Sequence, residues 1–183
     1  VMQPLADYRT GSGSGALYLD EPGFPGGTGR GLYTADWGKS WVYRHPLTPD
    51  GATFKAEQSE FIGVPRTIDM VVDAMSRLYV ASWRGAILNY AGEDVGWIVR
   101  VVPKGYQPEP LPDYDRAMES QLVAWLESPS HKRRIEAQRA LLRRGLTSQS
   151  EQALVAMARD QAKPLATRVA AVFTIKQALH EKS

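Results

Sequence analysis

Four prolines between residues 103 and 112 separate two stretches of this chain that differ in composition. Of the 16 glycines, 15 lie at or before residue 105, together with four of the five tryptophans, a mixture that favours strands and turns. Residues 111–183 are rich in Ala, Leu, Arg and Gln, which favour helices. Proline is excluded from central strands and helix interiors, so residues 103–114 are expected to be an extended linker. The sequence therefore predicts an α+β multidomain protein, with strands in residues 1–102 and helices in residues 115–183.

A repeat runs through the strand-rich part. The segments GLYTADW (31–37) and RLYVASW (77–83) share Leu, Tyr, Ala and Trp at an offset of 46. The segments WVYR (41–44) and WIVR (97–100) share Trp and Arg at an offset of 56. Repeats of about 40–50 residues built from short strands are typical of β-propeller blades. We interpret residues 1–102 as the last two blades of a partial β-propeller with antiparallel sheets; a small β-sandwich with a coincidental repeat is the alternative.

The repeat also places the strands. Residues 68–72 are predicted to form an inner strand, residues 78–82 the second strand and residues 97–102 the third. In the first copy, residues 54–61 are polar enough to be an exposed outer strand, which the second copy lacks. Two blades cannot close a ring, and Val1 is not a natural start. We therefore expect the chain to be a piece of a longer protein, whose missing blades are its partners.

The second part has the periodicity of four helices packed as two hairpins. Arg, Ala and Leu at 134, 137 and 141 recur as Arg, Ala and Ile at 168, 171 and 175, an offset of 34 that resembles HEAT-type repeats. Gly145 is expected to end the second helix, and Ser148 with Glu151 to open the third as a capping box. A protein partner could bind such a scaffold. The side chains predicted to face inward are Met118, Leu122, Ile135, Leu141, Leu154, Val172 and Phe173.

Several kinds of chemistry find no support in the sequence. The chain has no cysteine, and its three histidines are far apart with no spacing typical of metal ligands. A net charge of +2 does not indicate nucleic-acid binding, and the basic run Lys132-Arg133-Arg134 is interrupted by Glu136. No apolar run is long enough to span a bilayer. We therefore expect no nucleic-acid partner, no membrane span and no metal in this chain.

Four residues are candidates for ligand binding. Arg66 and Asp69 lie at the entry to an inner strand, which in a propeller opens on the axial face where ligands bind. They could hold a polar ligand such as a sugar, or they could pair with each other and stabilise the loop. Trp37 and Trp83 end the two equivalent second strands. Their recurrence indicates core packing first and a stacking platform for a ligand second.

The residues quoted above also carry a resemblance to a known family. Residues 32–37, 41–47, 50–54 and 73–83 are similar to the final blades of large membrane-bound dehydrogenases, the glucose/sorbosone dehydrogenase-like propellers best represented in Planctomycetes. In that family HEAT repeats follow the propeller, and the resemblance covers about residues 15–180. It implies an extracytoplasmic location and, for the full-length parent, pyrroloquinoline quinone and calcium as cofactors. No residue of this chain matches the histidine base or the calcium ligands of the related sugar dehydrogenases.

Two functions follow from these observations. In the first, the chain is the C-terminal portion of a sugar or polyol dehydrogenase-like propeller, inactive by itself because the catalytic residues lie in the missing blades. In the second, propeller and HEAT repeats form a non-catalytic scaffold that binds proteins or glycans. Both predict a chain without catalytic residues of its own.

Overall fold

A computed structural model describes residues 5–7, 10–83 and 93–180 of the chain. The chain divides into two compact units, Val1–Pro108 and Glu109–Ser183, and the division lies within the proline-rich stretch. The described residues form nine strands and four helices, which makes the protein α+β as the composition predicts. All strand pairs are antiparallel, and the sheets are open: the part of the chain that is described contains no closed barrel and no closed propeller.

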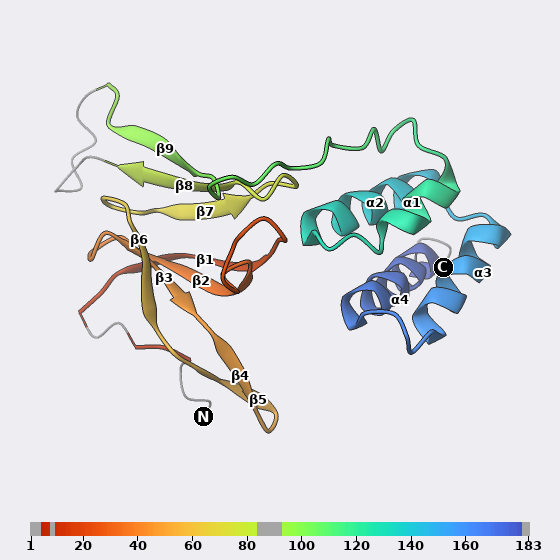
Figure 1. Ribbon diagram of the computed structural model, residues 1–183, viewed down its shortest axis with the longest axis horizontal. Helices are drawn as coiled ribbons and strands as arrows, with labels where there is room; N and C mark the ends of the chain where they lie inside the picture. Colours follow the sequence, from red (N-terminus) through yellow and green to blue (C-terminus); the bar gives the residue numbers. More distant parts are fainter. Residues whose placement is uncertain (1–4, 8–9, 84–92, 181–183) are drawn as a thin grey trace. The chain divides into compact units, whose positions relative to one another are not determined.

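The first unit begins with a four-stranded sheet in the order β1-β2-β3-β6 (Figure 1). Its strands are β1 (Gly13–Asp20), β2 (Arg30–Asp36), β3 (Trp41–His45) and β6 (Ser59–Gly63). Between β3 and β6 the chain forms a separate hairpin of β4 (Leu47–Asp50) and β5 (Thr53–Ala56). The prediction of one outer strand over residues 54–61 is therefore wrong. Residues 53–56 pair with β4, and only the segment from Ser59 onward pairs with β3 as the outer strand.

The second sheet has three strands, in the order β7-β8-β9. These are β7 (Asp69–Val72), β8 (Leu78–Trp83) and β9 (Gly96–Val101), which confirms the three strands expected from the repeat to within two residues. Asp73 closes the turn between β7 and β8. Its carboxylate accepts hydrogen bonds from the backbone N–H groups of Met75 and Arg77 and from the Tyr79 hydroxyl.

The two sheets pair their strands in the same register, residue for residue. In the first sheet Ala35 lies opposite Val42 and Tyr33 opposite Arg44; in the second, the repeat-equivalent Ala81 lies opposite Ile98 and Tyr79 opposite Arg100. The innermost pairs agree as well, because Leu17 opposite Tyr33 corresponds to Val71 opposite Tyr79. The sequence repeat is therefore a structural repeat of three strands.

The two sheets share one hydrophobic core. In Figure 1 β7 lies next to β1, and the contacts between these two strands join the layers. The first sheet contributes Leu19, Tyr33, Ala35 and Val42 to the core; the second contributes Met70, Val72, Leu78 and Val80. These two sets occupy opposite faces of the repeat. Equivalent residues consequently have different environments: Val42 is fully buried, whereas its equivalent Ile98 is 70% exposed.

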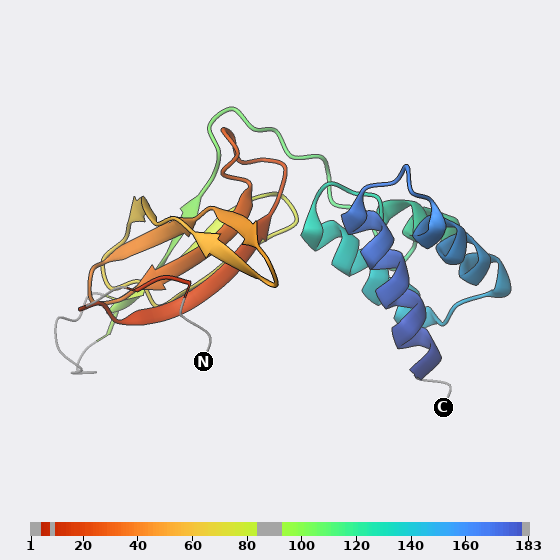
Figure 2. The same cartoon turned by 90° about the horizontal axis from the view of Figure 1, so that it is seen from below.

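The second unit contains four helices, α1 (Glu119–Trp125), α2 (His131–Arg144), α3 (Ser148–Arg159) and α4 (Leu165–His180) (Figure 2). Gly145 ends α2 with a positive φ of 78°, as predicted. The capping of α3 differs by one position from the prediction. Thr147, not Ser148, is the N-cap, and its hydroxyl accepts a hydrogen bond from the Ser150 N–H.

Equivalent arginines support the two hairpins in the same way. Arg134 donates to the carbonyl oxygens of Ser128 and Pro129, and Arg168 donates to that of Ala158. Each arginine thus binds carbonyl groups of the segment before the second helix of its hairpin: Ser128 and Pro129 lie in the turn after α1, and Ala158 lies in the last turn of α3. Arg134 therefore has a structural role.

The predicted inward-facing residues of α1 to α3 are correct except for Met118 at the N-cap of α1, and those of α4 are wrong. Leu122, Leu141 and Leu154 are fully buried, and Ile135 is half-buried. In contrast, Met118 is 64% exposed, and Val172 and Phe173 are about half exposed. The buried positions of α4 are the small residues Thr167, Ala171, Thr174 and Ala178. Because α4 is apolar on several faces, periodicity does not tell which face is inside.

Candidate functional site

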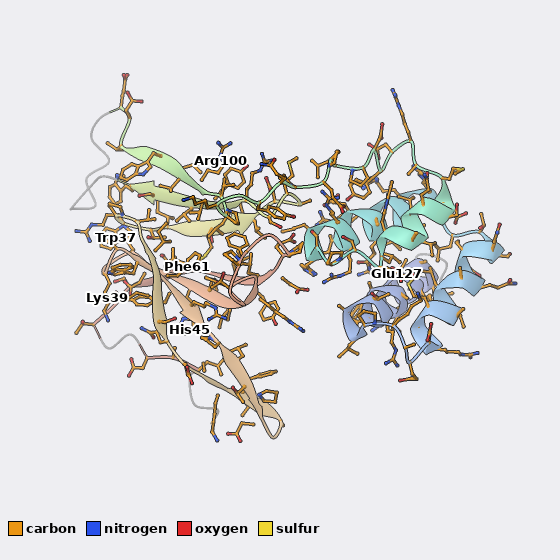
Figure 3. The ribbon with its side chains drawn as sticks, viewed as in Figure 1. Trp37, Lys39, His45, Phe61, Arg100 and Glu127 are labelled. Atoms are coloured by element: carbon orange, nitrogen blue, oxygen red, sulfur yellow. The ribbon has the colours of Figure 1, made fainter. Side chains whose placement is uncertain are left out.

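Three of the four candidate residues meet at one end of the two sheets. Trp37 follows the last residue of β2 and Trp83 is the last residue of β8, and their ring centroids are 6.1 Å apart with planes inclined by 32°. The Arg66 guanidinium carbon lies 4.3 Å from the centroid of the Trp37 ring, which is a cation–π contact. Figure 3 shows Trp37 at this end of the strands, with Lys39 nearby. We call Trp37, Arg66 and Trp83 the strand-end cluster.

The tryptophans of the cluster are not equally accessible. Trp83 is 9% exposed, so its ring belongs largely to the packing between the sheets. Trp37 and Arg66 are partly exposed. Of the two roles expected for the tryptophans, core packing therefore fits Trp83, while Trp37 and Arg66 offer a surface that a ligand can reach.

The loop that carries Arg66 is fixed on both sides. The Arg66 N–H donates to Ser40 Oγ (3.1 Å), the Val64 N–H donates to the Ser40 carbonyl (3.0 Å), and the Ser82 hydroxyl donates to the Pro65 carbonyl. Both Arg66 and Ser40 have a positive φ, 49° and 62°, which L-residues seldom adopt. Such conformations persist where the surroundings hold them, and they are concentrated at ligand sites. The backbone of Arg66 is thus fixed at a position from which its guanidinium group lies over Trp37.

The structure separates Asp69 from the cluster. Asp69 is exposed at the start of β7, and its Oδ1 accepts a hydrogen bond from the Met70 N–H. Its side chain lies against Gly15, where a Cβ atom would come within 2.6 Å of Asp69 Oδ1. Among the described residues, Arg66 and Asp69 form no ion pair with each other. Gly15 is the residue of the first sheet that is equivalent to Asp69 in the repeat. The close contact between the two explains why this position of the first sheet is a glycine.

Sequence reasoning missed Asp36. This residue is fully buried beside Trp37, and its Oδ1 accepts hydrogen bonds from the N–H groups of Ser12 (3.1 Å) and Lys39 (2.9 Å). Its Oδ2 has no hydrogen-bond partner among the described atoms. Asp36 fixes the β2–β3 turn that positions Trp37. The signal was an Asp at the start of a four-residue turn that contains Gly38, where a carboxylate can accept backbone hydrogen bonds.

The only histidine of the first unit lies within a sheet, not in the cluster. His45 is fully buried on β3, and its Nε2 is 2.8 Å from the Thr34 hydroxyl oxygen. Burial lowers the pKa of His45, which favours the neutral ring. The pKa of Asp73 is shifted as well. Burial would raise its pKa, but hydrogen bonds from Arg77, Met75 and Tyr79 outweigh that effect and lower it.

The basic run of the helical unit is engaged in structural contacts. Arg133 is 9% exposed and binds both the carboxylate and the carbonyl oxygen of Glu109. Arg134 is 6% exposed and binds carbonyl groups in the turn between α1 and α2. These two arginines anchor the start of the unit and do not form a surface for phosphate groups.

No family model, curated protein or solved structure matches this chain. None of the described helices is long and apolar enough to cross a membrane. Over the same residues, no three His, Asp or Glu side chains gather in a group that could hold a metal ion. The function is therefore argued from the repeat and from the strand-end cluster.

Proposed function

We propose that this chain is a binding scaffold: two neighbouring blades of a β-propeller followed by two HEAT-type hairpins. The shared register of the two sheets carries this proposal. Two antiparallel sheets that repeat each other strand for strand, and stack through their innermost strands, have the arrangement of adjacent blades. A β-sandwich with a coincidental repeat would not require equal registers.

The ligand that best fits the strand-end cluster is a sugar. The part of the Trp37 ring that Arg66 and Trp83 leave exposed offers apolar surface for the C–H groups of a sugar ring, and Arg66 offers N–H donors for its hydroxyl groups. Its fixed backbone keeps Arg66 in place before a ligand arrives, which reduces the entropy lost on binding. Asp69, which lies apart against Gly15, is a candidate for a peripheral contact only.

The chemistry of a dehydrogenase would have to come from other parts of a parent protein. Hydride transfer needs a base and a bound acceptor. Arginine stays protonated near neutral pH, and His45 is enclosed in its sheet. Pyrroloquinoline quinone and calcium, which the family resemblance implies, would be held by residues of the missing blades. An extracytoplasmic location follows from the same resemblance.

A binding and turnover experiment tests this function. Aldoses and polyols are titrated into the chain while tryptophan fluorescence is recorded, and sugar binding is expected to be lost in Arg66→Ala. Arg100→Ala is the matched control, because Arg100 lies on β9 and points away from the other sheet (Figure 3). With an artificial electron acceptor, pyrroloquinoline quinone and calcium, the chain should not oxidise the sugars. Quinone-dependent turnover that disappears in Arg66→Ala or Asp69→Ala would contradict the scaffold proposal.

A further inference from the structure

Among the described residues, one face of the β7–β8–β9 sheet carries an exposed apolar patch, with the charged residues Asp69 and Arg100 on the same face. Val71 is 52% exposed and Ile98 is 70% exposed, and Tyr79 and Ala81 beside them are half-buried. These four residues come from three adjacent strands and are neighbours in the pairing register. We call them the acceptor face. An exposed patch of this kind on a sheet indicates an interaction surface.

The repeat shows what an occupied acceptor face looks like. The equivalents of Val71, Tyr79, Ala81 and Ile98 in the first sheet are Leu17, Tyr33, Ala35 and Val42, so each position keeps its chemical type. In the first sheet this face packs against the second sheet, and Tyr33, Ala35 and Val42 are at most 1% exposed. Equivalent tyrosines are held in similar ways, since Tyr33 donates to the Thr28 carbonyl and Tyr79 to the Asp73 carboxylate.

The residues that cover the first sheet define the chemistry of the partner. They are Met70, Val72, Leu78 and Val80, a set of unbranched and branched aliphatic side chains on two paired strands, which we call the donor face. The stacking is head-to-tail, because the donor face and the acceptor face are opposite faces of the same repeat. Two sheets in head-to-tail contact do not close into a ring, so one acceptor face stays free at the end of the stack.

A second copy of this chain is a poor occupant. Its free donor-type face would be the outer face of the first sheet, where Met70, Val72, Leu78 and Val80 are replaced by Ala16, Tyr18, Leu32 and Thr34. The Thr34 hydroxyl is engaged with His45 Nε2, and Tyr18 forms a hydrogen bond with the Arg30 side chain. This face is more polar than the donor face and would leave part of the acceptor face poorly packed.

We propose that the acceptor face binds a further antiparallel sheet that presents a Met/Val/Leu/Val-type donor face, supplied by another segment and not by a second copy of this chain. This inference builds on the two-blade part of the proposed function and is independent of the sugar site. It specifies the face that is used, the side chains that meet it and the direction of the stack.

A tandem chain tests the proposal. A copy of residues 47–102 is inserted after Val102, so that its own β6 segment can return along β9, as β6 does along β3, and its donor face can reach the acceptor face. The chain has no cysteine, and Ile98→Cys therefore provides a single thiol whose reaction with a thiol reagent reports exposure. In the native-length chain Cys at this position should react rapidly. In the tandem chain its labelling should slow by at least about tenfold, because reaction then requires local opening of the new contact.

Two controls fix the meaning of the result. A thiol at the Ile98-equivalent position of the inserted copy should stay reactive, and changing the inserted copy's Met70 and Leu78 equivalents to Asp should restore rapid labelling at position 98. Equal labelling of position 98 in native-length and tandem chains would overturn the proposal, since the inserted segment is identical to one that already folds onto the first sheet. Protection that grows with protein concentration in the native-length chain would also overturn it, in favour of a second copy. Sugar binding through Arg66 is measured in parallel, so that a failed partner proposal is distinguished from a failed function.

Discussion

The sheet unit and the helical unit are both built by stacking a repeat, but they fill the stacking interface differently. In the sheets, the positions equivalent to the acceptor face keep their chemical type whether they are covered or not, as Val42 and Ile98 show. In the helices they change. Gln138 on α2 donates a hydrogen bond to Gln177 on α4, while its equivalent on α4 is the half-exposed Val172. In the sheets, the vacant face can therefore be recognised from the sequence, because its residues resemble those of the covered face. In the helices it can be recognised only from the exposed fractions of the side chains.

The largest difference is expected for a buried charge in the sheets. Val42→Asp should lower the free energy of unfolding by about 4 kcal/mol or more, because it places a carboxylate in the shared core. Ile98→Asp, at the equivalent exposed position, should change it by no more than about 0.5 kcal/mol. Denaturant unfolding followed by tryptophan fluorescence measures both variants. Equal losses would show that the two faces are not distinguished by packing.

In the helical unit, too, a change at a buried position should lower the free energy of unfolding more than one at an exposed position, by a smaller margin than in the sheets. Leu141→Ala removes a fully buried side chain and should cost about 2–5 kcal/mol. Val172→Ala, on the exposed face of α4, should cost about 0.5 kcal/mol or less, since little apolar area is lost from a core. Far-UV circular dichroism during urea unfolding follows both changes. A loss for Leu141→Ala below about 0.5 kcal/mol would mean that the inward face is misassigned.

The arginine contacts that join the helices are a third point of comparison. Arg134→Gln should cost about 1–3 kcal/mol, because it removes a buried charged donor from two partly buried hydrogen bonds to carbonyl groups. Arg139→Gln is the matched control, since Arg139 is exposed and its one ion pair among the described residues is with Glu136, three residues earlier. That control should change stability by less than about 0.5 kcal/mol. If the free energy of unfolding falls by the same amount in both variants, the burial of Arg134 adds nothing to stability.

A smaller effect is expected from pH. The pKa of His45 is lowered in the folded chain, so as pH falls below the ordinary value of 6.5 the unfolded state takes up a proton before the folded state does. The free energy of unfolding should therefore decrease as pH falls through this range and level off below the folded pKa. His45→Gln should remove this part of the pH dependence. If the free energy of unfolding of His45→Gln changes between pH 7 and 5 as it does in the unchanged chain, groups other than His45 cause this pH dependence.

Sequence reasoning went furthest where a repeat gave two views of one structure. The strands β7 to β9, the helical hairpins and the role of Arg134 were predictable, because spacing and identity both recur. The β4–β5 hairpin was missed, since a polar stretch around residue 54 is equally compatible with an outer strand. The exposed face of α4 was also missed, because its inner face is made of small and hydroxyl residues. The separation of Asp69 from Arg66 depends on the loop conformation at Arg66, which no spacing reveals.

The central claim is that one repeat face is buried in the first sheet and vacant in the second. Thiol labelling of two single-cysteine variants, Val42→Cys and Ile98→Cys, tests it most directly in the otherwise cysteine-free chain. The account predicts rapid labelling at position 98 under native conditions and protection at position 42 that is lost only when the sheet unit unfolds. Similar labelling rates at both positions in the folded protein would contradict the head-to-tail stack and the acceptor face derived from it.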